Sequence, residues 1–225
     1  MNEFQKILNN KTIAVVGPSP HLMGKNLGNK IDSYDIVCRL NELRPVGLED
    51  DYGKKADVLF WHLNNCDKHE FMIQRDVDPL GFKNVQMLVY PRQHQDVNRR
   101  GCGTSTPLEN ATTWFPETPF YQTDTKAVKS IEDAYQAHLT VGTLSLLMIL
   151  ECNFKELYVC GMSFYRHTGN REGYRYHTSQ PTQAHTRGEP HEIDKDIRCL
   201  RNFFKNRKNV SGDEYFKKII LQNNA

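Results

Sequence analysis

Residues 11–41 read KTIAVVGPSPHLMGKNLGNKIDSYDIVCRLN, and this stretch decides the fold. Its first apolar run, Ile-Ala-Val-Val, leads into Gly17, which is typical of a buried parallel strand that ends in a phosphate-accepting turn. Gly17, Gly24 and Gly28 would let the backbone approach a ligand closely. A helix starting near Leu22 would direct free N–H groups at an anion. The stretch therefore predicts an anion site at the end of the first strand.

A second apolar run, residues 35–38, delivers Arg39 and Asn41 to the same edge of the predicted sheet. A cation, an amide and a glycine turn would therefore converge there. Further apolar runs follow along the chain, and together they predict an α/β fold with a Rossmann-like, mainly parallel sheet flanked by helices. A chain of 225 residues suits a single domain. The expected strands are 12–16, 35–38, 56–61, 85–90 and 156–160.

Four segments of this stretch also match a family motif. They are Val15-Val16-Gly17, Gly28, Ile31-Asp32-Ser33-Tyr34-Asp35 and Arg39-Leu40-Asn41. In this order they resemble the large sialyl motif of glycosyltransferase family 29, the eukaryotic-type sialyltransferases. The resemblance implies a sialyltransferase-type variant of the GT-A fold and a CMP-sugar donor bound at Gly17, Pro18, Ser19 and Asn41. Pro18 stands where the family usually has asparagine and cannot donate a hydrogen bond, so Ser19 is the candidate to replace that contact.

A second stretch, residues 139–150, reads LTVGTLSLLMIL and predicts a loop that enters a buried helix. The helix N-terminus would form a second anion site. With the strand that follows, the stretch resembles the small sialyl motif of the same family. In this chain Val141 replaces the family's threonine, and Met162 replaces its aromatic residue. The resemblance implies donor contacts from Thr140, Val141, Gly142, Thr143 and Gly161.

Residues 163–189 are polar, aromatic and rich in histidine, and they predict a lid that orders over bound substrate. The histidine spacings in this region match no usual zinc-ligand pair, so we expect no metal site there. Residues 174–177, YRYH, resemble motif III of the family. That resemblance implies that Tyr176 and His177 lie near the donor phosphate and take part in catalysis.

Pro190 is expected to open a helix, with His191 in its first turn. The helix dipole at that place disfavours imidazolium, so the ring would stay neutral and able to accept a proton. The very short motif of the family is a histidine followed five residues later by an acid. His191 and Asp196 have this spacing, and the resemblance implies that His191 is the catalytic base.

The middle of the chain carries fewer signals. Residues 92–124 are rich in Gly, Pro, Thr, Asn and Gln, and they predict a long loop or a variable insertion on the acceptor side. Asp76 and Asp78 form an Asp-x-Asp pair, which binds metal in many other glycosyltransferases because two carboxylates can bridge a divalent ion to a diphosphate. The pair precedes Pro79 in a polar stretch, which favours a solvated turn.

Composition narrows the class of partner and the compartment. The net charge of +2 does not indicate a nucleic-acid partner. The sequence has no cationic-then-apolar leader and no apolar run of bilayer length, so we expect a cytoplasmic protein without a membrane span. The six cysteines form no C-x-x-C pair, and Ile13 stands where secretory family members carry the first cysteine of a disulfide.

Three functions fit these features. The first is a metal-independent, inverting glycosyltransferase that moves a sialic acid or a related 2-keto sugar acid from a CMP-sugar to a glycan hydroxyl, with no cofactor. The second is a metal-dependent nucleotide-sugar enzyme that uses Asp76 and Asp78. The third is a nucleotide-binding protein without turnover, which the replacements Pro18 and Val141 keep open. A P-loop NTPase is excluded because Asn26 stands where Ser or Thr must bind the metal.

Overall fold

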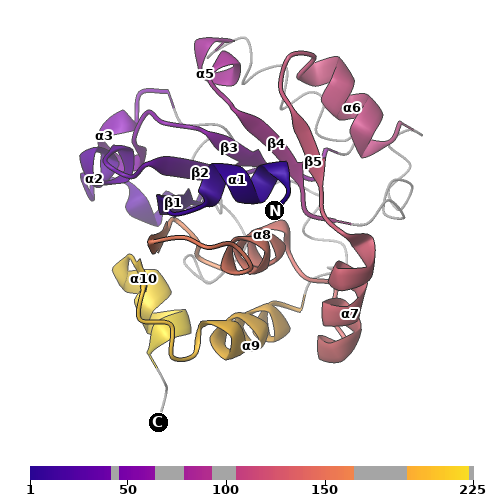
Figure 1. Ribbon diagram of the computed structural model, residues 1–225. Coiled ribbons are helices and arrows are strands. Elements are labelled where there is room, and N and C mark those ends of the chain that lie inside the picture. Colours follow the sequence, from indigo (N-terminus) through magenta and orange to yellow (C-terminus); the bar gives the residue numbers. More distant parts are fainter. Residues whose placement is uncertain (42–45, 64–78, 93–104, 165–191, 223–225) are drawn as a thin grey trace.

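The computed structural model describes residues 1–41, 46–63, 79–92, 105–164 and 192–222. Within these ranges seven strands form one sheet in the order β5-β4-β3-β2-β1-β6-β7, and all neighbouring strands are parallel (Figure 1). The strands are β1 (Thr12–Val16), β2 (Ile36–Leu40), β3 (Val58–Phe60), β4 (Met87–Tyr90), β5 (Phe120–Gln122), β6 (Glu156–Cys160) and β7 (Val210–Gly212). The predicted α/β fold with a mainly parallel sheet is confirmed.

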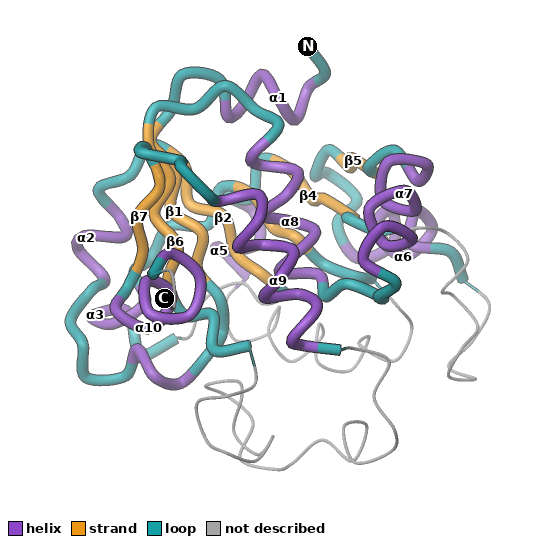
Figure 2. Tube along the Cα trace, turned by 90° about the horizontal axis from the view of Figure 1, so that it is seen from below, coloured by secondary structure: helices purple, strands orange, loops and turns teal. Residues whose placement is uncertain are grey.

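Helices cover both faces of the sheet, so the molecule has three layers (Figures 1 and 2). The apolar clusters place α1, α7, α8, α9 and α10 on one face and α2, α3, α5 and α6 on the other. No helix in the described ranges is both long and apolar enough to cross a bilayer. The helices are α1 (Glu3–Leu8), η1 (Pro20–Leu22), α2 (Gly28–Asp32), α3 (Glu49–Tyr52), α5 (Pro79–Lys83), α6 (Pro107–Trp114), α7 (Thr125–Tyr135), α8 (Val141–Leu150), α9 (Ile193–Phe204), α10 (Glu214–Phe216) and the π-helical turn η5 (Lys217–Leu221).

The central strand β1 is buried on both faces, as its unbroken apolar run predicts. Ile13 and Val15 pack into the cluster that contains α8 and α9. Ala14 and Val16 face the other way, into the cluster that contains α2 and α3. Because side chains alternate along a strand, one short apolar run ties the two helical layers together.

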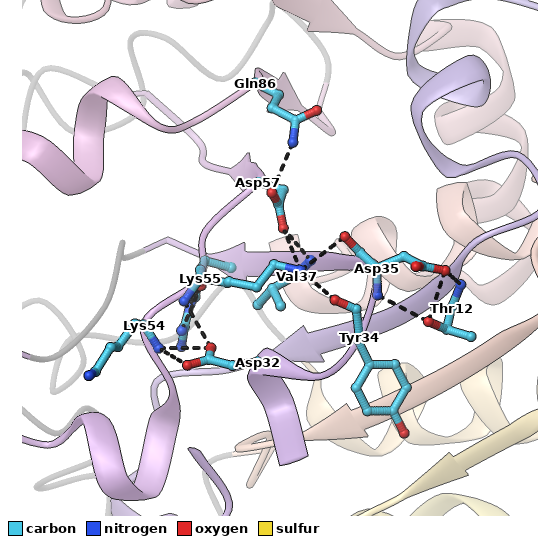
Figure 3. A network of polar contacts seen from close by, with 10 residues as sticks. Thr12, Asp32, Tyr34, Asp35, Val37, Lys54, Lys55, Asp57 and Gln86 are labelled. Atoms are coloured by element: carbon cyan, nitrogen blue, oxygen red, sulfur yellow. Dashed lines mark hydrogen bonds and ion pairs between the residues drawn. The ribbon is translucent and has the colours of Figure 1, made fainter. Parts of the chain in front are cut away.

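Carboxylates fix the register of the strands at their amino ends (Figure 3). The Asp57 carboxylate accepts hydrogen bonds from the Val37 amide at 2.8 Å and from Gln86 Nε2 at 2.9 Å. Asp35 accepts one from the Thr12 amide at 2.9 Å, and its bonds with Thr12 lower the pKa of the Asp35 carboxyl. A slip of one residue would break these contacts, so the carboxyl ends of the strands meet in a defined arrangement.

The strand order reverses beside β1. From β1 the chain steps through β2, β3, β4 and β5 in one direction, and β6 and β7 lie on the opposite side. In open α/β sheets such a switch point, at the carboxyl ends of the strands, is where ligands bind. The carboxyl ends of β1 and β6 meet at Gly17 and Gly161, and an ideal Cβ on either glycine would lie 2.3 Å from the carbonyl oxygen of the other.

The expectation that residues 92–124 form a long loop is wrong for the part that the structure describes. The segment contains α6 and the edge strand β5, which pairs with β4. The missed signal is a capping box in which Thr106 and Glu109 bond each other's backbone amides, with Pro107 at the first helical position. Residues 93–104 lie outside the described residues.

Residues 210–221 form a short strand followed by helical turns. Ser211 lies in β7, which pairs with β6 and completes the sheet. The helix begins only at Glu214, with Asp213 as its N-cap. Three-residue strands carry too little periodicity to be recognised from sequence, and only pairing with a neighbour defines them.

Four cysteines among the described residues are buried. Cys38, Cys160 and Cys199 are free thiols in the core, and so is Cys152. Burial raises the pKa of the Cys38 and Cys160 thiols, which keeps them protonated and unreactive.

Replacing Gly161 with alanine should destabilise the protein much more than replacing Gly24. Both glycines have a positive φ, +69° and +75°, so each alanine bears the same left-handed strain. A Cβ at Gly24 meets nothing within 4 Å, whereas at Gly161 it meets the Gly17 carbonyl. We expect a loss of no more than about 1 kcal/mol for Gly24→Ala and a further ~1–3 kcal/mol for Gly161→Ala, measured by urea denaturation. Equal losses in the two variants would show that the close approach is unimportant.

Candidate functional site

Four predicted donor segments meet at the carboxyl edge of the sheet, around the side chain of Met162. An ideal Cβ on Gly17 would lie 2.9 Å from Met162 Cγ, and one on Gly142 would lie 2.8 Å from Met162 Cε. The same Gly142 position lies 3.5 Å from Leu40 Cδ1, next to Asn41. The structure therefore brings together the ends of β1, β2 and β6 and the first turn of α8, where the predicted donor residues 17–19, 41, 140–143 and 161 lie.

The turn that follows β1, residues 17–19, does not leave its backbone amides available to an anion as the sequence analysis predicts. The Gly17 amide donates to the Cys160 carbonyl at 2.9 Å, and the Ser19 amide donates to the Gly161 carbonyl at 3.0 Å. Pro18 has no N–H group. Both amides of the turn are therefore bonded to carbonyls at the end of β6. The hydroxyl of Ser19 is the turn's remaining hydrogen-bond donor.

The helix expected near Leu22 is also absent. Only the 3-10 turn η1 forms, and the chain then passes through Gly24 and Asn26, both with positive φ. The Asp51 carboxylate accepts hydrogen bonds from the amides of Gly24 and Asn26, each at 2.7 Å. An internal carboxylate thus occupies the place that the sequence suggested for an anionic ligand.

The loop that follows β1 packs against α3 rather than against a ligand. An ideal Cβ on Gly28 would lie 2.0 Å from the Glu49 carbonyl oxygen, so glycine is needed for helix packing. The Tyr52 hydroxyl donates to the Ser19 carbonyl at 2.7 Å. The segment after β2 therefore shapes the loop that follows β1.

Arg39 has a structural role instead of the expected place beside an anion. Its side chain is buried and donates from Nε at 3.0 Å and from Nη2 at 2.8 Å to the Lys55 carbonyl. Nη2 also donates to the Gly53 carbonyl at 3.1 Å. The residue lies on the face of β2 opposite Leu40, because side chains alternate along the strand.

Asn41 lies at the carboxyl edge of the sheet, immediately after β2. Its φ of +58° is a left-handed conformation that asparagine tolerates better than most residues, and its amide donates to the Phe60 carbonyl at 2.7 Å. His62 Nδ1 lies 3.2 Å from Asn41 Oδ1. The side-chain oxygen is an acceptor, so this contact places a proton on His62 Nδ1 and leaves Asn41 Nδ2 as a donor.

The N-terminus of α8 is held by a buried carboxylate. Asp196 Oδ1 accepts from the Thr140 amide at 2.9 Å and lies 2.8 Å from Thr140 Oγ1. The Asp196 side chain is 0% exposed, and its Oδ2 has no hydrogen-bond partner among the described residues. Burial raises the pKa of Asp196, while hydrogen bonds from Thr143 and Thr140 act against this shift.

The backbone of Leu139, just before Thr140, is held by hydrogen bonds with two side chains. The Leu139 amide donates to Glu132 Oε1 at 3.0 Å, and Arg92 Nη2 donates to the Leu139 carbonyl at 2.7 Å. His138 connects these two side chains, with Nε2 bonded to Arg92 Nη1 and Nδ1 lying 3.3 Å from Glu132 Oε1. Since arginine can only donate, His138 Nε2 must be the acceptor and Nδ1 carries the proton.

A chain of hydrogen bonds that the sequence analysis missed links the ends of β1 and β7. Ser19 Oγ lies 2.8 Å from His21 Nδ1, and His21 Nε2 lies 2.9 Å from Asp213 Oδ2. Asp213 also accepts from the amides of Gly161 and Phe216. Burial alone would raise the pKa of Asp213, but the bonds from His21 and the two amides outweigh it and lower that pKa.

Most of the chain matches a known family. The model of glycosyltransferase family 29 (sialyltransferase) matches residues 3–208, which is most of the chain. The chain belongs to glycosyltransferase family 29. A relative by sequence is the β-galactoside α-2,6-sialyltransferase 2 of Danio rerio, 29% identical over 134 residues. The alignment covers 57% of this chain and 26% of the zebrafish protein, so the chain spans only a small part of that relative.

Solved structures of sialyltransferases share the fold of this chain at low sequence identity. The sialyltransferase CstII of Campylobacter jejuni, in complex with cytidine-5'-monophosphate, superposes with a TM-score of 0.59 at 15% identity, covering 94% of this chain and 84% of that one. A mammalian sialyltransferase in complex with Gal-β-1-3GalNAc-ortho-nitrophenol gives a TM-score of 0.51 at 17% identity, covering 92% of this chain and 71% of that one.

The residues that the resemblance to family 29 assigned to catalysis lie outside the described residues. They are Tyr176, His177 and His191. Residues 165–189 of the proposed lid and the Asp76-Asp78 pair also lie outside the described residues. The helix expected to open at Pro190 begins at Ile193, with Glu192 as its N-cap. Within the described residues, no group of three or more His, Cys, Asp or Glu side chains could hold a metal ion.

The raised pKa of Asp196 predicts how stability changes with pH. A carboxyl whose pKa is higher in the folded than in the unfolded protein stabilises the fold below its unfolded value and loses this contribution as pH rises through the folded value. Relative to Asp196→Asn, the wild type should therefore gain stability as the pH falls from about 7 toward the ordinary aspartate value of 3.8. Urea denaturation of both proteins across this range measures the difference. A difference independent of pH would contradict the assignment.

Proposed function

We propose that this chain is a metal-independent, inverting glycosyltransferase that moves a sialic acid or a related 2-keto sugar acid from a CMP-sugar to a glycan hydroxyl. The observation that carries the proposal is the family 29 match over residues 3–208, combined with the meeting of its two sialyl motifs around Met162. Neither motif alone would carry it, because a glycine turn or a helix N-terminus occurs in many folds.

The carboxyl edge has the polar groups that a nucleoside monophosphate needs. The first turn of α8 directs N–H groups that have no acceptor within the helix toward this edge. Asn41 Nδ2 is oriented by His62 as a donor, and the Ser19 hydroxyl lies on the neighbouring turn. The complex of CstII with cytidine-5'-monophosphate supports cytidine as the nucleoside, because that protein has the same fold.

The proposed chemistry is a single displacement. The bond between the sugar and the phosphate breaks with oxocarbenium character at the reacting carbon, and CMP leaves with the electron pair. The acceptor hydroxyl attacks from the opposite side and passes its proton to His191, so the configuration inverts. Tyr176, His177 and Ser19 are the proposed donors that stabilise the departing phosphate. Because CMP leaves with one phosphate, no metal is needed to bridge a diphosphate.

The proposed acceptor is a glycan. A mammalian sialyltransferase with this fold was solved in complex with Gal-β-1-3GalNAc-ortho-nitrophenol, which supports a carbohydrate hydroxyl as the attacking group. The linkage and the acceptor sugar would depend on segments such as 93–104, which lie outside the described residues.

Calorimetric titration with CMP, UMP, GDP and ADP tests the donor class, and CMP should bind most tightly. Asn41→Ala should weaken CMP binding by about 1–3 kcal/mol, because a polar group of the ligand loses its partner. The matched control is Asn84→Ala, an exposed asparagine between α5 and β4 at the amino edge of the sheet. Equal CMP affinity in both variants and the wild type would count against a donor site at Asn41.

Replacing the proposed base separates catalysis from binding. His191→Ala should lower the transfer rate by about two to four orders of magnitude, the usual effect of losing a general base, while CMP affinity stays near the wild-type value. The same assay with EDTA should leave wild-type transfer intact. If EDTA abolished transfer, the metal-dependent alternative with Asp76 and Asp78 would replace this mechanism.

A further inference from the structure

The hydrogen-bonded chain Ser19, His21 and Asp213 contains the groups that enzymes use to move protons to and from a hydroxyl. Ser19 follows β1, His21 lies in η1, and Asp213 follows β7. This series of hydrogen bonds therefore spans the switch point of the sheet. Ser19 is 2% exposed, and the side chains of His21 and Asp213 are 8% and 7% exposed. Hydrogen bonds between such buried groups are stronger than in water.

The proton positions follow from the partners. Asp213 has a lowered pKa and is a carboxylate, which can only accept, so His21 Nε2 carries a proton. Two states remain for Nδ1. In neutral His21 it accepts the Ser19 proton, and the hydroxyl cannot donate elsewhere. In protonated His21 it donates to Ser19 Oγ, and the hydroxyl proton becomes available to a ligand.

The surroundings favour the second state when an anion binds. The Asp213 carboxylate faces the ring at 2.9 Å, and Tyr215 stacks on it with ring centroids 5.0 Å apart. Other titratable groups on elements packed nearby include Cys160, whose raised pKa keeps it neutral, and Tyr52, whose hydroxyl donates to the Ser19 carbonyl. A phosphate at the turn would add a second anion close to the ring, and both anions stabilise imidazolium.

We propose that His21 takes up a proton when a phosphate monoester binds at this edge, so that the Ser19 hydroxyl turns from His21 and donates to a phosphate oxygen. The proposal rests on the proposed function, because CMP and its sugar ester supply that phosphate. The proton comes from solvent, and no bond other than hydrogen bonds changes. His21 is then a positioning residue that decides whether Ser19 can act as a donor. The backbone amides of residues 17 and 19 are used by β6, which leaves this task to the hydroxyl.

Proton-linked calorimetry tests this role directly. CMP and cytidine are titrated into the wild type at about pH 8, where the CMP phosphate is a dianion, in two buffers with different ionisation enthalpies. The buffer dependence of the binding enthalpy gives the number of protons exchanged. We expect CMP binding to take up as much as about one proton, and cytidine binding, which lacks the phosphate, to take up none.

Two variants locate the proton. His21→Asn should abolish the uptake on CMP binding. Ser19→Ala keeps His21 and Asp213 paired, and it should weaken CMP roughly ten- to hundredfold while leaving cytidine affinity near the wild-type value. The urea midpoint of each variant shows whether it is folded. If His21→Asn does not fold, the CMP affinity of Ser19→Ala tests the proposal.

The outcomes separate this proposal from the proposed function. If the wild type does not bind CMP, both are wrong. If CMP binds with the same proton uptake in the wild type and in His21→Asn, the donor site stands and the role of His21 is overturned. Unchanged CMP affinity in Ser19→Ala would show that Ser19, His21 and Asp213 only connect β1 to β7 and do not contact the phosphate. That result would also overturn the proposal.

Discussion

The close contact between Gly17 and Gly161 is the constraint on which the rest of this structure depends. Both residues lie at the carboxyl ends of neighbouring parallel strands, and an ideal Cβ on either would come within 2.3 Å of the other's carbonyl oxygen. Two amides of the first turn bond to carbonyls at the end of β6. Because the backbones touch, the two sialyl motifs, which are far apart in the sequence, share one edge of the sheet.

Aspartates have different tasks at the two edges of the sheet. At the amino edge, Asp35 and Asp57 bond neighbouring strands and fix their register. At the carboxyl edge, Asp51, Asp196 and Asp213 each hold the backbone of a loop or helix end that belongs to the candidate site. Loops without regular structure need such partners, since their buried amides would otherwise lack acceptors.

Residues near the C-terminus hold the candidate site in place, although most of the site's own residues come earlier in the sequence. Asp196 on α9 bonds Thr140, and Asp213 after β7 bonds both His21 and the Gly161 amide. The pKa values of the two carboxyls shift in opposite directions, because burial dominates at Asp196, whereas the hydrogen bonds from His21, Phe216 and Gly161 outweigh burial at Asp213. Burial is therefore compensated at one carboxylate and only partly at the other.

The sequence by itself determined the α/β class, the central strand β1 and the family, because an apolar run of fixed length and a motif in fixed order are local properties. It also placed Asn41 and Thr140 at the edge where they are found. Only the tertiary structure decided that Arg39 and Gly28 serve packing, that Asp51 fills the expected anion site, and that His21 meets Asp213. These outcomes depend on contacts between segments distant in the chain, and the short strands β5 and β7 exist only through such pairing.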